Sequence, residues 1–170
     1  MIPKYLNQSK QLVFDKCDFE IENLIIEKES VDYCASKFDL NTFKILFRTA
    51  KITPTKIGQF VTLWKRFEKG PIQPYDSNDP IDFFIINTMS GAKFGLFIFS
   101  KSVLIQQGII TTPLKEGKRA IRVYPPWDKT ISKLAQKTQK WQLNYFLEIP
   151  SEQSLNIERA KSLFVIDSST

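Results

Sequence analysis

Two apolar runs near the middle of the chain place the tightest limit on its fold. The first reads IDFFII over residues 81–86, and the second reads KFGLFIFSK over residues 93–101. Both have the length of a strand, and neither alternates between apolar and polar residues as a half-exposed strand would. Continuous apolar runs of this length are typical of central strands covered on both faces. The sequence therefore predicts a sheet that lies between two layers of other elements.

The remaining periodicities predict helices and strands around that sheet. Strand alternation indicates a hairpin of residues 33–40 and 42–51. Apolar residues at helical spacing predict a helix that begins at Thr53 or Thr55 and includes Phe67. The other expected elements are a helix over 5–13, an ambiguous segment over 18–29, a loop over 69–80, a short helix or turn over 102–108, a strand over 119–125, a helix capped by Asp128, and an edge strand over 162–166. This order predicts an α+β or α/β-like fold in which helices flank one central mixed sheet.

Residue types that the chain lacks exclude several kinds of site. Its 170 residues suffice for one domain over residues 1–170, and none of them is histidine. Without histidine, the usual zinc ligand sets and a nucleophile activated by an imidazole are excluded. Cys17 and Cys34 are interpreted as reduced, core-type residues. The N-terminal segment has no apolar run long enough for a signal peptide or a membrane span, so we expect a cytoplasmic protein without a membrane partner.

Charge is distributed unevenly along the chain. The net charge is +6, yet residues 15–39 have eight acidic and three basic side chains, and residues 93–147 have ten basic and two acidic ones. No carboxylate lies between Asp39 and Glu68, although six cationic side chains do. Segregated charge of this kind indicates an anionic partner on one side of the molecule. The alternative is that the segregation disappears when the chain folds, leaving ordinary solvated surfaces.

Four sequence blocks occur in order between Phe43 and Phe146. They read FRTAKITPTKIGQFVTLWKR, GLFIFSKSVLIQQGI, GKRAIRVYPPWD and TQKWQLNYF. These blocks resemble the MepB family of small bacterial proteins, often encoded beside a multidrug efflux pump and its repressor. The family usually has proline where this chain has Ser100. The resemblance implies a topology similar to the catalytic core of restriction-endonuclease-like PD-(D/E)xK enzymes, and it implies nucleic-acid binding.

A nuclease of that type needs an aspartate on one strand and an acid two residues before a lysine on the next, so that carboxylates hold Mg²⁺. Two frames supply the aspartate and the lysine: Asp82 with Lys101, and Asp39 with Lys51. In both frames the second acid is missing, because Phe99 and Thr49 occupy its position. Glu20 or Glu22 could add one ligand, which makes a poor metal site. We therefore expect a degenerate nuclease-like fold without a cofactor, with a metal-dependent phosphodiesterase as the alternative.

Nucleic-acid binding requires only cations spaced to meet phosphates, and aromatic rings if unpaired bases are to stack. The candidate residues are Arg48, Lys51, Lys56, Lys65, Arg66, Lys101, Lys118, Arg119, Arg122, Tyr124, Trp127, Lys133 and Lys137. Lys133, Lys137 and Lys140 form one helical ridge, which could equally be an ordinary solvated face. Trp64 and Trp141 are expected in the core, whereas Trp127 beside two prolines is the better candidate for an exposed ring.

The chain shows no helix-turn-helix, zinc-finger or RNP pattern that would read bases. We therefore expect a monomer that binds nucleic acid with low sequence specificity, DNA more readily than RNA. A third possibility is an accessory protein-interaction module, in which the acidic segment 15–39 or the basic face contacts another protein.

Overall fold

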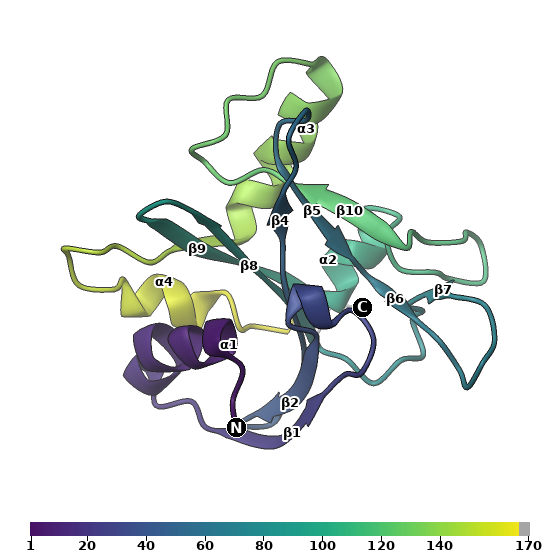
Figure 1. Ribbon diagram of the computed structural model, residues 1–170, viewed down its shortest axis with the longest axis horizontal. Helices are drawn as coiled ribbons and strands as arrows, with labels where there is room; N and C mark the ends of the chain where they lie inside the picture. The colour runs from purple at the N-terminus through teal and green to yellow at the C-terminus, as the bar shows by residue number, and fades with distance from the viewer. Residues whose placement is uncertain (167–170) are drawn as a thin grey trace.

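A six-stranded mixed sheet forms the centre of the computed structural model, which describes residues 1–166 (Figure 1). Its strands are β1 (Ile21–Ile26), β2 (Ser36–Leu40), β3 (Phe43–Thr49), β8 (Phe83–Ser90), β9 (Lys93–Ser100) and β11 (Phe146–Glu148). They lie in the order β1-β2-β3-β8-β9-β11. Strands β3 and β8 run parallel, and the other neighbours are antiparallel. The predicted α+β class with one central mixed sheet is confirmed.

The two apolar runs form β8 and β9, next to each other inside this sheet. Residues 83–88 and 94–99 are all buried, so both faces of these strands are covered, as predicted. Asn87 and Thr88 are the polar members of the buried β8 segment, and Thr88 satisfies its hydroxyl by donating to the carbonyl of Gly95.

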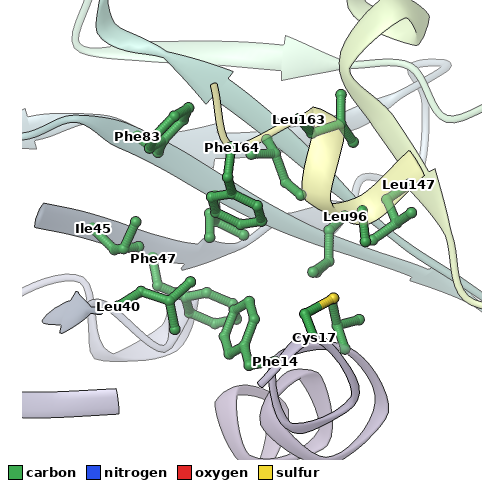
Figure 2. Packing of buried hydrophobic residues seen from close by; sticks show 14 of the residues in the cluster. Phe14, Cys17, Leu40, Ile45, Phe47, Phe83, Leu96, Leu147, Leu163 and Phe164 are labelled. Atoms are coloured by element: carbon green, nitrogen blue, oxygen red, sulfur yellow. The ribbon is translucent and has the colours of Figure 1, made fainter. Parts of the chain in front are cut away.

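Helical segments from the two ends of the chain cover one face of the sheet. They are α1 (Lys4–Ser9), a π-helical turn (Lys10–Phe14), a 3₁₀ turn (Asp15–Cys17) and α4 (Ile157–Ser162). Figure 2 shows Phe14 and Cys17 from the N-terminal segment and Leu163 and Phe164 after α4 meeting side chains of the sheet, among them Phe47. Through this apolar cluster, the N-terminal helical segment and the segment around α4 both pack against the sheet.

The opposite face is covered by α2 and a second, smaller sheet. The elements on this side are β4 (Lys51–Ile52), β5 (Gln59–Thr62), β6 (Trp64–Lys65), β7 (Gln73–Pro74), α2 (Lys101–Gln106), β10 (Ala120–Val123) and α3 (Lys133–Gln142). Strands β10, β5 and β4 form a three-stranded antiparallel sheet. Its Val61, Ile121 and Val123 pack in one cluster with Phe84 and Phe97 of the large sheet. The β4–β5 hairpin, dark blue in Figure 1, extends toward α3 at the top of the view.

Several local predictions are confirmed. Strands β2 and β3 form the expected hairpin, and Asn41 in its turn has φ of 53°, a conformation that asparagine tolerates better than most residues. The predicted short helix or turn over 102–108 is the helix α2, and the predicted strand over 119–125 is β10. Ser100, where the family usually has proline, caps α2 because its hydroxyl accepts a hydrogen bond from the Val103 amide.

The prediction of a helix from Thr53 or Thr55 to Phe67 is wrong. Residues 53–58 form a loop, and the following residues form β5 and β6. Gln59, Val61 and Leu63 are buried, whereas the residues between them are half-exposed. This pattern has the period of a strand, and pairing with β10 supplies the backbone hydrogen bonds that a helix would have made internally.

Two further boundaries differ from the predictions. Helix α3 is capped by Ser132, whose hydroxyl accepts from the Ala135 amide at 3.1 Å, whereas the Asp128 amide closes a turn on the carbonyl of Pro125. Residues 162–166 form no strand, because the side chains of Leu163 and Phe164 are buried against the large sheet directly after α4. The edge strands of that sheet are β1 and β11, and β11 pairs with β9.

Candidate nucleic-acid interface

An open groove of about 780 Å³ lies between the small sheet and α3. Its lining comes from the loop between β4 and β5, from β5 and β10, and from α3. The loop that precedes β10 closes one side through Lys118. Because these elements are far apart in the sequence, the groove exists only in the folded chain.

Two glutamines of α3 fix its position against β10. The Oε1 atom of Gln142 accepts from the Tyr124 amide at 2.8 Å, and its Nε2 donates to the Arg122 carbonyl at 2.9 Å. Gln139 donates from Nε2 to the carbonyls of Pro125 and Asp128, at 3.0 and 2.9 Å. The backbone after β10 is thereby satisfied by side chains of α3, so the two sides of the groove are held in a defined arrangement.

Four cationic side chains line the groove: Lys56, Lys118, Arg122 and Lys137. The three lysines are exposed, and none of them forms an ion pair within residues 1–166. Arg122 is half-buried, and its guanidinium donates to Thr53 Oγ1 at 2.6 Å and to the carbonyls of Ile57 and Gly58, each at 3.2 Å. No acidic side chain of the described residues lines the groove, so its charge is uniformly positive.

Three half-buried aromatic rings line the groove together with these cations: Phe60 of β5, Tyr124 after β10, and Trp141 of α3. The ring centroid of Trp141 is 5.4 Å from that of Phe99 in the large sheet. Gly58 lies against the Tyr124 ring so closely that a Cβ at this position would be 2.6 Å from Tyr124 Cε1. These rings are therefore packed against the protein on one side and line the groove on the other.

The structure brings five of the predicted binding residues together in this groove: Lys56, Lys118, Arg122, Tyr124 and Lys137. Sequence reasoning missed Phe60, Trp141, Thr53 and Gln107, among others. A usable signal existed on α3, because Leu134, Lys137, Thr138 and Trp141 have the spacing of one helix face. Assigning Trp141 to the core alone concealed that face.

Arg48 is not part of this surface. Its side chain is fully buried, and its Nη2 pairs with Glu27 Oε2 at 3.0 Å and donates to the hydroxyl of Tyr75 at 3.2 Å. Period-two spacing placed Arg48 on the same strand face as Lys44, but β3 is buried on both faces from Ile45 to Thr49, so only Lys44 at the start of the strand is exposed. The expected contact between Arg48 and a phosphate is therefore corrected to a structural ion pair.

Lys65 and Lys101 are occupied within a loop formed by residues 76–79. Lys65 Nζ lies 2.8 Å from an oxygen of both Asp76 and Asp79. Burial alone would lower the pKa of Lys65, but the two carboxylates outweigh it and raise that pKa, and the Lys65 ammonium in turn lowers the pKa of Asp76. Lys101 donates to the carbonyls of Ser77 and Asp79. These interactions leave neither ammonium free at the surface.

Most of the other predicted residues also have partners within the protein. Lys51 pairs with Asp32 at 3.5 Å, Arg66 with Glu29 at 3.0 Å, and Arg119 with Glu116 at 3.0 Å. Trp127, the ring predicted to be exposed, is half-buried and packs edge-on against Phe146 at a centroid distance of 5.8 Å. Lys133 is exposed but lies outside the groove, so the ridge predicted on α3 contributes only Lys137 to the groove lining.

The aspartates of the two candidate nuclease motifs, Asp82 and Asp39, form hydrogen bonds within the protein. Asp82 Oδ2 accepts from the Lys44 amide at 2.7 Å, and the Asp82 carbonyl accepts from the Lys101 amide at 3.0 Å. Asp39 accepts from Lys44 and Asn23, and these hydrogen bonds lower the pKa of Asp39. Within the described part of the chain, no three acidic or cysteine side chains are grouped so as to hold a metal ion.

Fold and groove together define an α+β protein in which a six-stranded mixed sheet supports a small sheet and an electropositive groove. The chain belongs to the MepB-like family, whose model matches residues 27–148. Every residue that lines the groove lies within that range. A crystal structure of MepB is 36% identical in sequence, with a TM-score of 0.75 over 89% of this chain and 99% of the other.

A bacterial homing endonuclease shares 16% sequence identity, with a TM-score of 0.49 over 84% of this chain and 89% of the other. A likeness at this level says nothing about activity. Comparison with curated proteins gives no match. Among residues 1–166, no helix is both long and apolar enough to cross a membrane.

Proposed function

We propose that this protein binds nucleic acid through the groove between the small sheet and α3, with low sequence specificity. The observation that supports this function best is the difference between two sets of cations. Lys56, Lys118 and Lys137 line one concave surface without a carboxylate partner in the described residues. Most other predicted cations are neutralised by acids of the protein, whereas these three lysines leave uncompensated positive charge on one concave surface that a ligand can enter.

Three exposed lysines around one groove suit a phosphate backbone better than a single anion. They come from three separate segments, the β4–β5 loop, the loop before β10 and α3, and all three line the same groove. Each lysine that neutralises a phosphate releases condensed counterions, and this release favours binding at low salt. Long lysine side chains adapt to different backbone geometries, which agrees with low sequence specificity.

Fluorescence anisotropy with labelled oligonucleotides at several salt concentrations tests this function. The groove variant K56A/K118A/K137A removes the three lysines that line the groove. A matched control, K4A/K16A/K161A, removes three exposed lysines from the helical layer around α1 and α4, on the opposite side of the molecule (Figure 1). Both variants change the net charge by the same amount, so a purely global charge effect would weaken binding equally.

We expect the wild type to bind at low salt, with an affinity that falls linearly against the logarithm of salt concentration. The groove variant should bind at least about tenfold more weakly. Its slope should be shallower by about 2, because each single-strand phosphate that a lysine neutralises contributes roughly 0.7. The control should resemble the wild type. Absence of wild-type binding at low salt, or equal weakening in both variants, would contradict the proposed function.

A further inference from the structure

The lining of the groove is more apolar than a surface that contacts only phosphates requires. Besides its cations it contains Phe60, Tyr124 and Trp141, together with Ile109, Ile121 and Leu134. Leu134 is 77% exposed although it belongs to a helix that packs against the protein, and Ile57 beside Lys56 is 39% exposed. Exposed apolar side chains gathered at a concave surface mark a place where an apolar part of a ligand is bound.

We infer that the ligand of this groove is a single strand, from which at least one unpaired base enters the groove and stacks on its aromatic rings. This inference rests on the proposed function and specifies its ligand. In a duplex the base faces are stacked on one another, and only phosphates, sugars and base edges can be reached from outside. Aromatic rings at the bottom of a groove contribute to binding only if base faces are accessible, as they are in a single strand.

The rings are held in place before any ligand arrives. Trp141 packs against Phe99, and the Phe60 and Tyr33 rings meet edge-on with their centroids 6.3 Å apart. The Tyr124 ring lies directly against Gly58, and its backbone amide is fixed by Gln142. Rings that are already ordered lose little conformational entropy when a base stacks on them.

The arrangement of charge matches this mode of binding. Lys56, Lys118 and Lys137 line the groove from three separate segments of the chain, and the three aromatic rings line the same groove. A backbone that follows the lysines would place its bases over the rings. The groove, at about 780 Å³, has the size of sites that enclose a small organic ligand. A base with its sugar can enter a groove of this size, whereas a duplex could touch only its rim.

The test compares four labelled oligomers of roughly 15 units, close to the site sizes of single-strand binding folds. They are a single-stranded DNA, the same sequence as a duplex, an abasic deoxyribose-phosphate strand of equal charge, and a single-stranded RNA. We expect one or both of the natural single strands to bind at least about tenfold more tightly than the duplex and the abasic strand at the same salt concentration. The RNA arm identifies which sugar is preferred.

Tryptophan fluorescence provides a second readout, which depends on stacking and not on charge. The natural single strand should quench the fluorescence, and the abasic strand should not. Quenching should be lost in W141F and retained in W127F, because Trp127 lies outside the groove and packs against Phe146. Since the comparison of oligomers uses the wild type, it remains decisive even if a tryptophan variant folds poorly.

Outcomes that contradict the inference differ from those that contradict the proposed function. Equal affinity for the abasic and natural strands, or tighter binding of the duplex, overturns single-strand stacking while nucleic-acid binding remains. If none of the four oligomers binds at low salt, both fail together.

Discussion

Arg48 and Glu27 form an ion pair, with Nη2 and Oε2 3.0 Å apart, in which the arginine side chain is fully buried and the glutamate side chain is 20% exposed. The pair joins β3 of the large sheet to the segment that follows β1. Tyr75, from the loop after β7, and the carbonyl of Phe47 also accept hydrogen bonds from the same guanidinium. A charge inside the core is tolerated because these partners replace the water that surrounds it in the unfolded chain.

Replacing Arg48 with methionine should lower the free energy of unfolding strongly. The change removes a partner of both Glu27 and Tyr75, and breaking a buried ion pair typically costs about 3–5 kcal/mol. Lys37 Nζ still lies 3.6 Å from Glu27 Oε1, so we expect a loss at the lower end of that range. Urea denaturation measures the decrease. Lys44→Met on the same strand face is the control, because the Lys44 side chain is 56% exposed and should matter little. Similar unfolding midpoints for the two variants would contradict a structural role for Arg48.

Tyr75 should make stability depend on alkaline pH. Burial, the largest cause, raises the pKa of Tyr75 to about 12, although the nearby Arg48 guanidinium lowers it. Because this pKa lies above the unfolded value near 10, the stabilisation is fully present below pH 10 and is lost as pH rises toward 12. The stability difference between wild type and Tyr75→Phe should shrink across that window, by up to about 3 kcal/mol. Parallel pH profiles from urea titrations would exclude this role.

Gly58→Ala should disturb both stability and the groove. Gly58 has φ of 85°, and an added Cβ would meet the Tyr124 ring at 2.6 Å. Gly91→Ala is the matched control, because Gly91 has φ of 59° and no atom lies within 4 Å of its added Cβ. Both variants should lose about 1 kcal/mol from backbone strain. Only Gly58→Ala should lose more stability than this and weaken oligonucleotide binding. Thermal denaturation measures the first effect and fluorescence anisotropy the second. If the two variants have equal stability and equal affinity, the Tyr124 ring moves aside without cost, which would contradict the prediction.

Ser132→Ala should loosen the beginning of α3. The Ser132 hydroxyl caps the helix, and removal of such a cap costs about 1 kcal/mol. Hydrogen exchange of the amides in the first turn should accelerate, while exchange in β8 and β9 should not change. Ser154→Ala, an exposed loop position, serves as the comparison. Unchanged exchange in α3 would show that Gln139 and Gln142 alone hold the helix in place.

The sequence predicted the fold correctly where apolar residues dominated a whole segment. The apolar runs in β8 and β9 predict buried central strands because apolar side chains point to both faces of each strand. This prediction depends only on the local sequence and needs no information about distant residues. The segment over 59–65 misled because Val61 and Trp64, three residues apart, fit a helical spacing, whereas the buried strand positions Gln59, Val61 and Leu63 include a polar glutamine. Its pairing with β10, some sixty residues later, decided the outcome, and no local pattern contains that information.

The candidate site was predictable only in part for a related reason. Sequence shows which residues are cationic, but it does not show which carboxylates will neutralise them. Lys65 and Lys56 looked alike in the sequence, yet Lys65 meets Asp76 and Asp79 whereas Lys56 faces the groove. Arg48 followed the strand pattern correctly, but whether its face met water or the core depended on packing of the small sheet.

The most direct test of the central claim is lysine acetylation footprinting with and without a saturating single-stranded oligonucleotide. Mass spectrometry reports the modification rate at each lysine. If the groove binds nucleic acid, Lys56, Lys118 and Lys137 become protected together, while Lys4 and Lys161 on the far side react at unchanged rates. Protection confined to lysines outside the groove, with these three unaffected while the oligonucleotide is bound, would contradict the account.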